Sequence, residues 1–168
     1  MKRILFSLLI ALTAVFVSCT VKYSLSGASI PPDAKTFSVA YFPNNAPMVA
    51  PILSATLTDE LTQRFASRTS LVQVEEGGDF AFEGEIVGYS STTASVSSDD
   101  YAVLNRLMIT VKVKFTNVVE PKNSFNQTFQ AFTDYDSQQL LTDVQSALDE
   151  EIVEQLVTDI YQAAASNW

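Results

Sequence analysis

The sequence contains no histidine and a single cysteine among its 168 residues. Without histidine, the chain has no imidazole to bind a metal, to serve as the base of a catalytic triad or to act as a general acid near neutral pH. One cysteine cannot form an internal disulfide or a cysteine-rich metal site. These absences exclude most hydrolases and zinc proteins, and we expect the protein to be no enzyme and to bind no cofactor.

Basic residues are also scarce, because 10 Lys and Arg stand against 19 Asp and Glu and give a formal net charge of -9. Proteins that bind nucleic acids take much of their affinity from neutralising phosphates. The acidic balance therefore argues against a nucleic-acid partner.

With 47% hydrophobic and 11% aromatic residues, the composition is that of a single folded domain rather than of a disordered chain.

Long apolar runs are missing except at the N-terminus, where Lys2 and Arg3 precede the run from Ile4 to Val17. As a helix, this run would span about 21 Å, which is less than the roughly 30 Å of a bilayer core. A basic start followed by a short apolar run is typical of a secretory signal peptide. We expect residues 1–18 to be removed as a lipoprotein signal peptide, which would take away two basic residues and change the net charge from -9 to -11.

The single cysteine, Cys19, directly follows this run and is preceded by the small residue Ser18. This arrangement resembles the lipobox of bacterial lipoproteins, in which the cysteine is lipidated and becomes the first residue. Phe16 stands where the lipobox commonly has Leu, so an ordinary signal peptide with an incidental free cysteine is the alternative. A lone thiol is a liability in an oxidising compartment, which favours lipidation.

Acyl chains on Cys19, palmitate among them, would anchor the protein to a membrane. Thr20 and Val21 follow the cysteine, and neither is the aspartate that retains lipoproteins at the inner membrane. Lipoprotein sorting therefore predicts the outer membrane, and the absence of an acidic run after the cysteine favours its inner, periplasmic leaflet.

A composition rich in Ser, Gly and Pro predicts a tether over residues 19–35, and hydrophobic periodicity predicts one domain over residues 36–168. Alternation with a period of two predicts strands, and apolar residues at steps of four predict amphipathic helices. The economical arrangement is an α+β two-layer sandwich, with two amphipathic helices packed on one face of a mostly antiparallel sheet of four or five strands. The predicted strands are residues 36–42, 71–74, 80–89, 101–119 and 124–135, and the predicted helices are residues 49–67 and 137–166.

Several finer expectations follow from the same patterns. The strand over residues 36–42 should place Tyr41 on the core face with Phe37. Gly88 should lie on the core face of its strand, and the aromatic spacing of residues 124–135 suggests a bulge near Gln130. In the last helix, we expect Asp136 or Ser137 to cap the N-terminus, and the acidic residues to form a solvated face. Those acidic residues are Asp149, Glu150, Glu151, Glu154 and Asp159.

Motifs for catalysis are missing, because the chain has no nucleophile elbow, phosphate-binding loop or dinucleotide-binding glycine pattern. The carboxylate pairs at Glu75-Glu76 and Asp99-Asp100 lie in predicted turns, where solvated acids are ordinary. One charge feature stands out: Arg106, Lys112 and Lys114 lie an even number of residues apart on one strand and should point to its non-core face. This basic strip either binds an anionic ligand or protects the sheet from aggregation.

A set of short strings in fixed order resembles the LptE family of lipopolysaccharide-assembly lipoproteins, most closely its Bacteroidetes-type members. The resemblance spans essentially the whole chain after the signal peptide and includes the leading cysteine and the acidic closing helix. The strings are Tyr23-Ser24-Leu25-Ser26-Gly27, Ser29-Ile30-Pro31-Pro32, Tyr41-Phe42-Pro43-Asn44, Leu57-Thr58-Asp59, Gly78-Asp79-Phe80 and Phe82-Glu83-Gly84-Glu85-Ile86-Val87-Gly88-Tyr89.

The resemblance implies a two-helix, four-stranded sandwich that sits as a plug inside the LptD β-barrel of the outer membrane. Such a protein helps to assemble the barrel, binds lipopolysaccharide and assists its delivery to the cell surface, without catalysis. The basic strip is not carried over from the family and rests on charge patterning alone. The alternative function is a free-standing, periplasmic-facing lipoprotein that binds a small hydrophobic or anionic ligand, and a hydrophobic ligand would require an apolar cavity.

Overall fold

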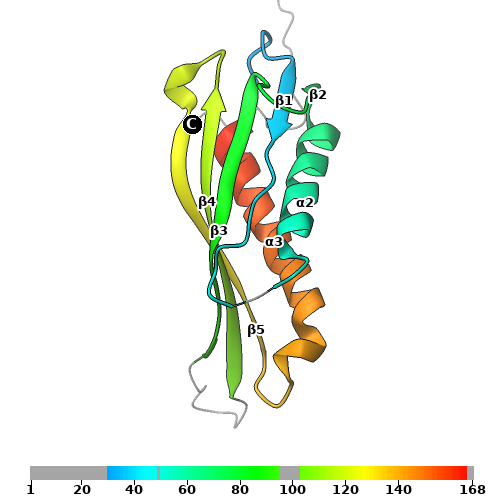
Figure 1. Cartoon of the computed structure of the whole chain (residues 1–168), viewed down its shortest axis with the longest axis vertical. Coiled ribbons are helices and arrows are strands. Elements are labelled where there is room, and N and C mark those ends of the chain that lie inside the picture. The colour runs from blue at the N-terminus through cyan, green and yellow to red at the C-terminus, as the bar shows by residue number, and fades with distance from the viewer. Residues whose placement is uncertain (1–29, 49, 95–102, 166–168) are drawn as a thin grey trace, which may run out of the picture.

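The computed structural model describes residues 30–48, 50–94 and 103–165. Figure 1 shows two layers, with both helices on the same side of a twisted sheet. The predicted α+β two-layer sandwich is confirmed, with five strands. The elements in chain order are β1 (Thr36–Val39), α2 (Leu53–Arg68), β2 (Val72–Gln73), β3 (Phe80–Thr93), β4 (Leu104–Asn117), the short 3-10 helix η2 (Pro121–Asn123), β5 (Phe125–Asp136) and α3 (Leu141–Ala165).

The sheet has the order β2-β1-β3-β4-β5 and is mixed. The three long strands β3, β4 and β5 are antiparallel neighbours, as predicted. The short strand β1 runs parallel to both β2 and β3, because α2 carries the chain back along the sheet between β1 and β2. The sheet therefore ends on one side with the two-residue β2 and on the other with the twelve-residue β5.

The core between the layers is rich in phenylalanine. Phe65 of α2 is fully buried, and its ring centroid lies 4.6 Å from that of Phe82, 5.9 Å from that of Phe37 and 5.1 Å from that of Tyr161. Phe65 therefore joins both helices to the sheet at one point. The predicted apolar stripes are buried in both helices, at Leu53, Leu57, Leu61 and Phe65 in α2 and at Leu148, Ile152, Leu156 and Ile160 in α3.

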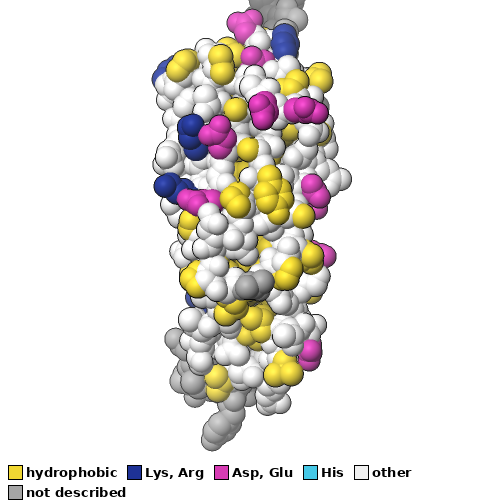
Figure 2. Space-filling model, viewed as in Figure 1, with side chains coloured by type: hydrophobic (Ala, Val, Ile, Leu, Met, Phe, Trp, Pro, Cys, Tyr) yellow, Lys and Arg dark blue, Asp and Glu magenta, His cyan; other side chains and the backbone are white. Residues whose placement is uncertain are grey.

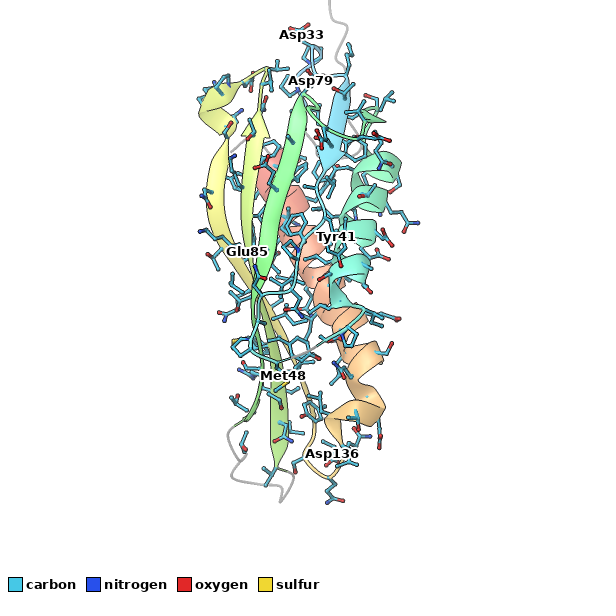
Figure 3. The ribbon with its side chains drawn as sticks, viewed as in Figure 1. Asp33, Tyr41, Met48, Asp79, Glu85 and Asp136 are labelled. Carbon is cyan, nitrogen blue, oxygen red and sulfur yellow. The ribbon has the colours of Figure 1, made fainter. Side chains whose placement is uncertain are left out.

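The first strand ends earlier than predicted, and the assignment of Tyr41 to the core was wrong. After Val39 the chain follows β3 without regular pairing, and the Ala40 N–H donates to the Phe82 carbonyl. The alternation breaks in this segment, so that Tyr41 is 63% exposed while Phe42 is fully buried. The side chain of Tyr41 is labelled in Figure 3.

The ring of Phe42 occupies the space that a side chain on Gly84 would need. A Cβ atom at this position of β3 would lie 2.5 Å from Cε1 of Phe42 and 2.3 Å from the carbonyl oxygen of Lys112. Both distances are shorter than any van der Waals contact, and one of the two atoms belongs to the backbone. The glycine therefore lets Phe42 close the core over β3.

We expect Gly84→Ala to lower the free energy of unfolding by about 2 to 3 kcal/mol, because overpacking forces neighbouring atoms to move. Chemical denaturation would measure the loss. Gly88→Ala is the matched control, since a Cβ there would lie 3.0 Å from Cβ and Oγ1 of Thr110, a much milder clash that a shift of a few tenths of an ångström relieves. An equal loss in the two variants would contradict this explanation.

A β-bulge occurs in β3 and not in β5. The pairing of β3 with β4 shifts between Ile86 and Gly88, which moves Gly88 off the core face and places Tyr89 on it. The predicted bulge near Gln130 was wrong, because β5 pairs with β4 without a shift over its whole length. The bulge was inferred by assigning Phe132 to the core, but this residue lies on the opposite face and is 44% exposed.

Both helices begin later than predicted. Residues 51 and 52 form a turn ahead of α2, and the Leu53 N–H donates to the Ala50 carbonyl. Before α3, the carboxylate of Asp136 accepts a hydrogen bond from the Gln138 N–H, so it stabilises the turn rather than the helix. Neither Asp136 nor Ser137 therefore caps α3, which begins at Leu141.

Asp79 connects the start of β3 to the start of β1. Its Oδ2 atom accepts hydrogen bonds from the backbone N–H groups of Lys35 and Thr36, at 2.8 and 2.9 Å, and from the Thr36 hydroxyl at 2.9 Å. These donors lower the pKa of the Asp79 carboxyl. The neighbouring Gly78 has no room for a side chain, since a Cβ would lie 2.6 Å from the backbone of Phe37.

In the ranges that the structure describes, no helix combines the length and the hydropathy that a transmembrane segment requires.

Candidate functional site

Both helices cover one face of the sheet, and the other face, which we call the outer sheet face, carries the basic strip. Arg106, Lys112 and Lys114 project from β4 on this face and alternate with buried residues of the core. The shared direction predicted for the three side chains is confirmed. β4 lies between β3 and β5, so these cations occupy the middle of the sheet and not its edge.

Arg106 forms the tightest contacts of the strip. Its Nε and Nη2 atoms donate to the two carboxylate oxygens of Asp134 on β5, at 2.7 and 2.9 Å, and its guanidinium lies 3.8 Å from the centroid of the Phe132 ring. The bidentate hydrogen bonds lower the pKa of Asp134 and raise that of Arg106. The alternation of β5 places Phe132 on the outer sheet face, and there its ring packs against this guanidinium in a cation-π contact.

The two lysines face carboxylates on the neighbouring strand β3. Lys114 Nζ donates to Glu83 Oε2 at 2.9 Å, and Lys112 stands directly opposite Glu85 in the strand register. Glu85 also accepts a hydrogen bond from Asn45 Nδ2 at 2.7 Å. Three basic residues are thus matched by three acidic ones, and Figure 2 shows Lys and Arg side chains next to acidic ones on this part of the surface.

A shallow hollow of about 330 Å³ opens between these side chains. It is an open depression rather than an enclosed cavity, and four of its seven lining residues are charged. Both lysines of the strip contribute to it, together with the two glutamates of β3. The lining residues are Pro43, Glu83, Gly84, Glu85, Lys112, Lys114 and Asn126.

The helical side of the molecule has the opposite electrostatic character. Exposed acids far outnumber the basic residues Arg64 and Arg68 there. A negatively charged ligand would be repelled by this side and tolerated by the neutral outer sheet face. The exposed acids of the two helices are Asp59, Glu60, Asp143, Glu150, Glu151, Glu154 and Asp159.

We expect Arg106→Gln to raise the pKa of Asp134 towards the ordinary value of an aspartate, because the charged hydrogen-bond donors are lost. A carboxyl ¹³C NMR titration would follow this group directly. Lys122→Gln, which removes an exposed cation of η2 away from the strip, should leave the titration of Asp134 unchanged. An unaltered pKa in Arg106→Gln would mean that the pair is not formed in solution.

Sequence reasoning missed a buried polar cluster between α3 and the sheet. Asp149 was predicted on a solvated helix face, but it is only 3% exposed, and its Oδ1 atom accepts a hydrogen bond from the Tyr89 hydroxyl at 3.0 Å. Gln145 Nε2 in turn donates to the Tyr89 hydroxyl at 2.9 Å. The other four acids of that prediction, Glu150, Glu151, Glu154 and Asp159, are exposed as expected.

Burial raises the pKa of Asp149 to about 6, against the opposing effect of the hydrogen bond from Tyr89. Burial likewise raises the pKa of the Tyr89 hydroxyl above its ordinary value. None of the three residues of the cluster lines the hollow on the outer sheet face, and they satisfy one another by hydrogen bonds. The cluster acts as a polar contact within the core that holds the N-terminal half of α3 on the sheet.

The remaining candidate residues do not form a site. Glu75 and Glu76 are exposed in the turn after β2, whereas Asp99, Asp100 and Cys19 lie outside the described residues. Within the described part of the chain, no three residues of the metal-binding types His, Cys, Asp and Glu come together to hold an ion.

Two solved structures share this fold at low sequence identity. The hypothetical protein CT253 from Chlamydia trachomatis is 11% identical, with a TM-score of 0.54 and coverage of 80% of this chain and 99% of that one. The protein XCC0632 from Xanthomonas campestris is 15% identical, with a TM-score of 0.55 and coverage of 79% and 87%. At these identities, the likeness shows the fold alone.

No curated protein matches the sequence. The sequence model of the LptE family, described as "Lipopolysaccharide-assembly", matches residues 34–164, which include every strand and nearly all of the closing helix. The match covers more than half of the chain and agrees with the resemblance in the short strings. The chain belongs to the LptE family of lipopolysaccharide-assembly proteins.

Proposed function

We propose that the protein is an outer-membrane lipoprotein that plugs an LptD-type β-barrel, helps to assemble it and assists the delivery of lipopolysaccharide to the cell surface. The observation that carries this proposal is the family match over residues 34–164. In this proposal the chain is a binding and positioning protein, and it performs no catalysis.

The physical character of the folded domain supports a role as a plug. A plug must remain rigid, and the aromatic core around Phe65 joins both helices to the sheet. It must also suit the polar interior of a barrel, and the outer sheet face is polar with balanced charges. The alternative of a free-standing protein that binds a small hydrophobic ligand has less support, because the hollows on the outer sheet face, along α3 and beside β2 are all open and lined by charged side chains.

The partnership can be tested by purifying the tagged, lipidated chain from outer membranes in a mild detergent. We expect a large β-barrel protein to be recovered at close to one copy per chain. A control purification from cells that carry the untagged chain would show which proteins bind the resin alone. Recovery of a stable, monomeric chain without a barrel would overturn the proposal and favour the free-standing lipoprotein.

The membrane anchor is a separate part of the proposal. Residues 1–18 would be cleaved, lipid on Cys19 would hold the chain in the periplasmic leaflet, and residues 19–35 would serve as a tether. Growth with an alkyne-bearing fatty acid should label the wild-type chain, whereas Cys19→Ser should remain unlabelled and leave the membrane fraction. A labelled Cys19→Ser chain would exclude this cysteine as the anchor.

Direct binding of lipopolysaccharide is assigned to the basic strip. Because Lys114 is paired with Glu83 and Lys112 stands opposite Glu85, phosphate groups would have to compete with these carboxylates for the lysines. We expect Lys112→Gln to weaken binding of purified lipopolysaccharide about tenfold, which corresponds to roughly 1.4 kcal/mol. Lys122→Gln serves as the control with the same change of charge, and an equal effect in both variants would exclude the strip as the site.

A further inference from the structure

The two edges of the sheet differ in how they are protected against pairing with another strand. One edge is the two-residue β2, which is too short to accept a partner. The other edge is β5, which has twelve residues and pairs with β4 in unbroken register. In Figure 1 the first half of β5, drawn in yellow, runs along the left border of the sheet; the short η2 lies above its start, and no other strand or helix of the described residues lies outside it.

Exposed edge strands in proteins are usually blunted by lysine, proline or a bulge, because their unpaired backbone groups attract other strands. β5 has none of these devices: its sequence contains no Lys, Arg, Pro or Gly, and it has no bulge. The cations of this sheet face stand one strand inwards, on β4, and the bulge is in β3. The basic strip therefore does not protect the edge.

The free side of β5 presents backbone groups that have no partner among the described residues. In the described ranges, the backbone of residues 125–135 forms hydrogen bonds with β4 alone. The strand is also held in place, because Phe129, Ala131 and Tyr135 are buried beneath α3. An edge that is already fixed and regularly paired on its inner side loses little conformational entropy when a further strand binds to it.

We propose that β5 binds an extended segment of the β-barrel partner by strand addition, so that the sheet continues into the partner. This inference rests on the proposed function and names the surface that meets the barrel. The exposed side chains along the edge, Asn126, Thr128 and Gln130, fit a polar and uncharged segment. Asp134 is paired with Arg106, whereas Asp136 is exposed and favours a basic residue opposite it.

Electrostatics argue against a second copy of this chain as the occupant. Thr133 of β5 lies within hydrogen-bond distance of Glu151 on α3, at 3.0 Å, so the acidic helix runs close to the edge. Two β5 strands pairing edge to edge would bring two such helices, with exposed Glu150 and Glu154, next to each other. The like charges of the two helices would repel each other, and the net negative charge of each chain would add to the cost of pairing.

Amide hydrogen exchange on the full lipidated chain, alone and in complex with the barrel, tests this inference directly. In the free chain, alternate amides of β5 should exchange rapidly, because they point away from β4. In the complex, these amides should become protected by at least about tenfold, whereas the amides of β4 should hardly change since they are already paired.

A pair of variants on the same sheet face supplies the control. Gln130→Lys places a charge on the edge, and Thr110→Lys places the same charge on the residue directly opposite it in β4. We expect Gln130→Lys to reduce recovery of the barrel about tenfold and Thr110→Lys to leave it within about twofold, because lysine on an edge opposes strand addition. A larger loss for Thr110→Lys than for Gln130→Lys would assign the contact to the face rather than to the edge and overturn the inference.

The possible failures are distinguishable. A barrel complex that forms without added protection of β5 would overturn the inference and leave the proposed function intact. A chain that is dimeric and protected in β5 without the barrel would identify a second copy as the occupant and would also overturn it. If no barrel is recovered at all, the proposed function fails, and this inference fails with it.

Discussion

Phe65→Ala should lower the free energy of unfolding by about 3 to 5 kcal/mol, which is the range for removal of a buried phenylalanine ring. The ring is fully buried and packs against Phe37 and Phe82 of the sheet and Tyr161 of α3. Its loss would leave a cavity where α2, α3 and the sheet meet, and the neighbouring rings belong to three different elements that cannot all collapse into it.

Chemical denaturation of the wild-type and variant proteins would measure this effect. Phe132→Ala is the matched control, because it removes the same side chain from the outer sheet face, where the ring is 44% exposed. It should cost about 1 kcal/mol or less, mainly through the contact with Arg106. A smaller loss for Phe65→Ala than for Phe132→Ala would contradict the assignment of the core.

Asp149→Asn should stabilise the protein above neutral pH by up to about 3 kcal/mol and have little effect near pH 4. The pKa of Asp149 is raised from 3.8 to about 6 by burial, so the folded state favours the neutral carboxyl. The stability that this group contributes is therefore fully present below pH 4 and is lost as the pH rises through 6. Asparagine stays neutral and can still accept the hydrogen bond from Tyr89.

Thermal or chemical unfolding at several pH values between 4 and 8 would test this prediction. Asp134→Asn provides a control whose effect on stability has the opposite pH dependence. Arg106 lowers the pKa of Asp134, so the ionised carboxylate stabilises the folded protein and this stabilisation is lost as the pH falls. If Asp149→Asn destabilised the protein at pH 8, the ionised carboxylate would be a favourable member of the cluster, and burial would not be the dominant influence on this group.

The regular elements were predictable because their burial follows a simple period. Ile109, Val111 and Val113 of β4 alternate with polar residues and are all fully buried. The helical stripes at steps of four residues are buried in the same way, so the two-layer arrangement followed from amphipathic faces that need covering. The direction of the basic strip also followed, because β4 has no bulge to change the alternation.

The failures occur where tertiary contacts override the local pattern. Tyr41 and Phe42 exchange the expected positions because the chain leaves the strand conformation after Val39 to follow β3. Asp149 resembles the other acids of α3 in sequence, and only its position opposite Tyr89, sixty residues away, makes it a buried residue. The carboxylates that neutralise the basic strip also come from other strands, so the charge of this surface could not be read from β4 alone.

Several of the short strings behind the family resemblance have structural roles in this protein. Gly78 lies against the backbone of Phe37, and Asp79 ties β3 to the start of β1. Gly84 makes room for Phe42, which comes from another of the strings. These strings therefore specify how β1 and the following segment dock on β3. Their residues have structural roles, so the resemblance to the family identifies the fold and does not identify ligand-binding residues.

Depletion of the chain in growing cells is the most direct test of the central claim, that this protein supports a barrel which delivers lipopolysaccharide. Surface lipopolysaccharide and the amount of mature, folded barrel should be measured together after expression is stopped. We predict that both decline and that expression of the wild-type chain restores them. Normal amounts of both in cells that lack the chain would contradict this claim.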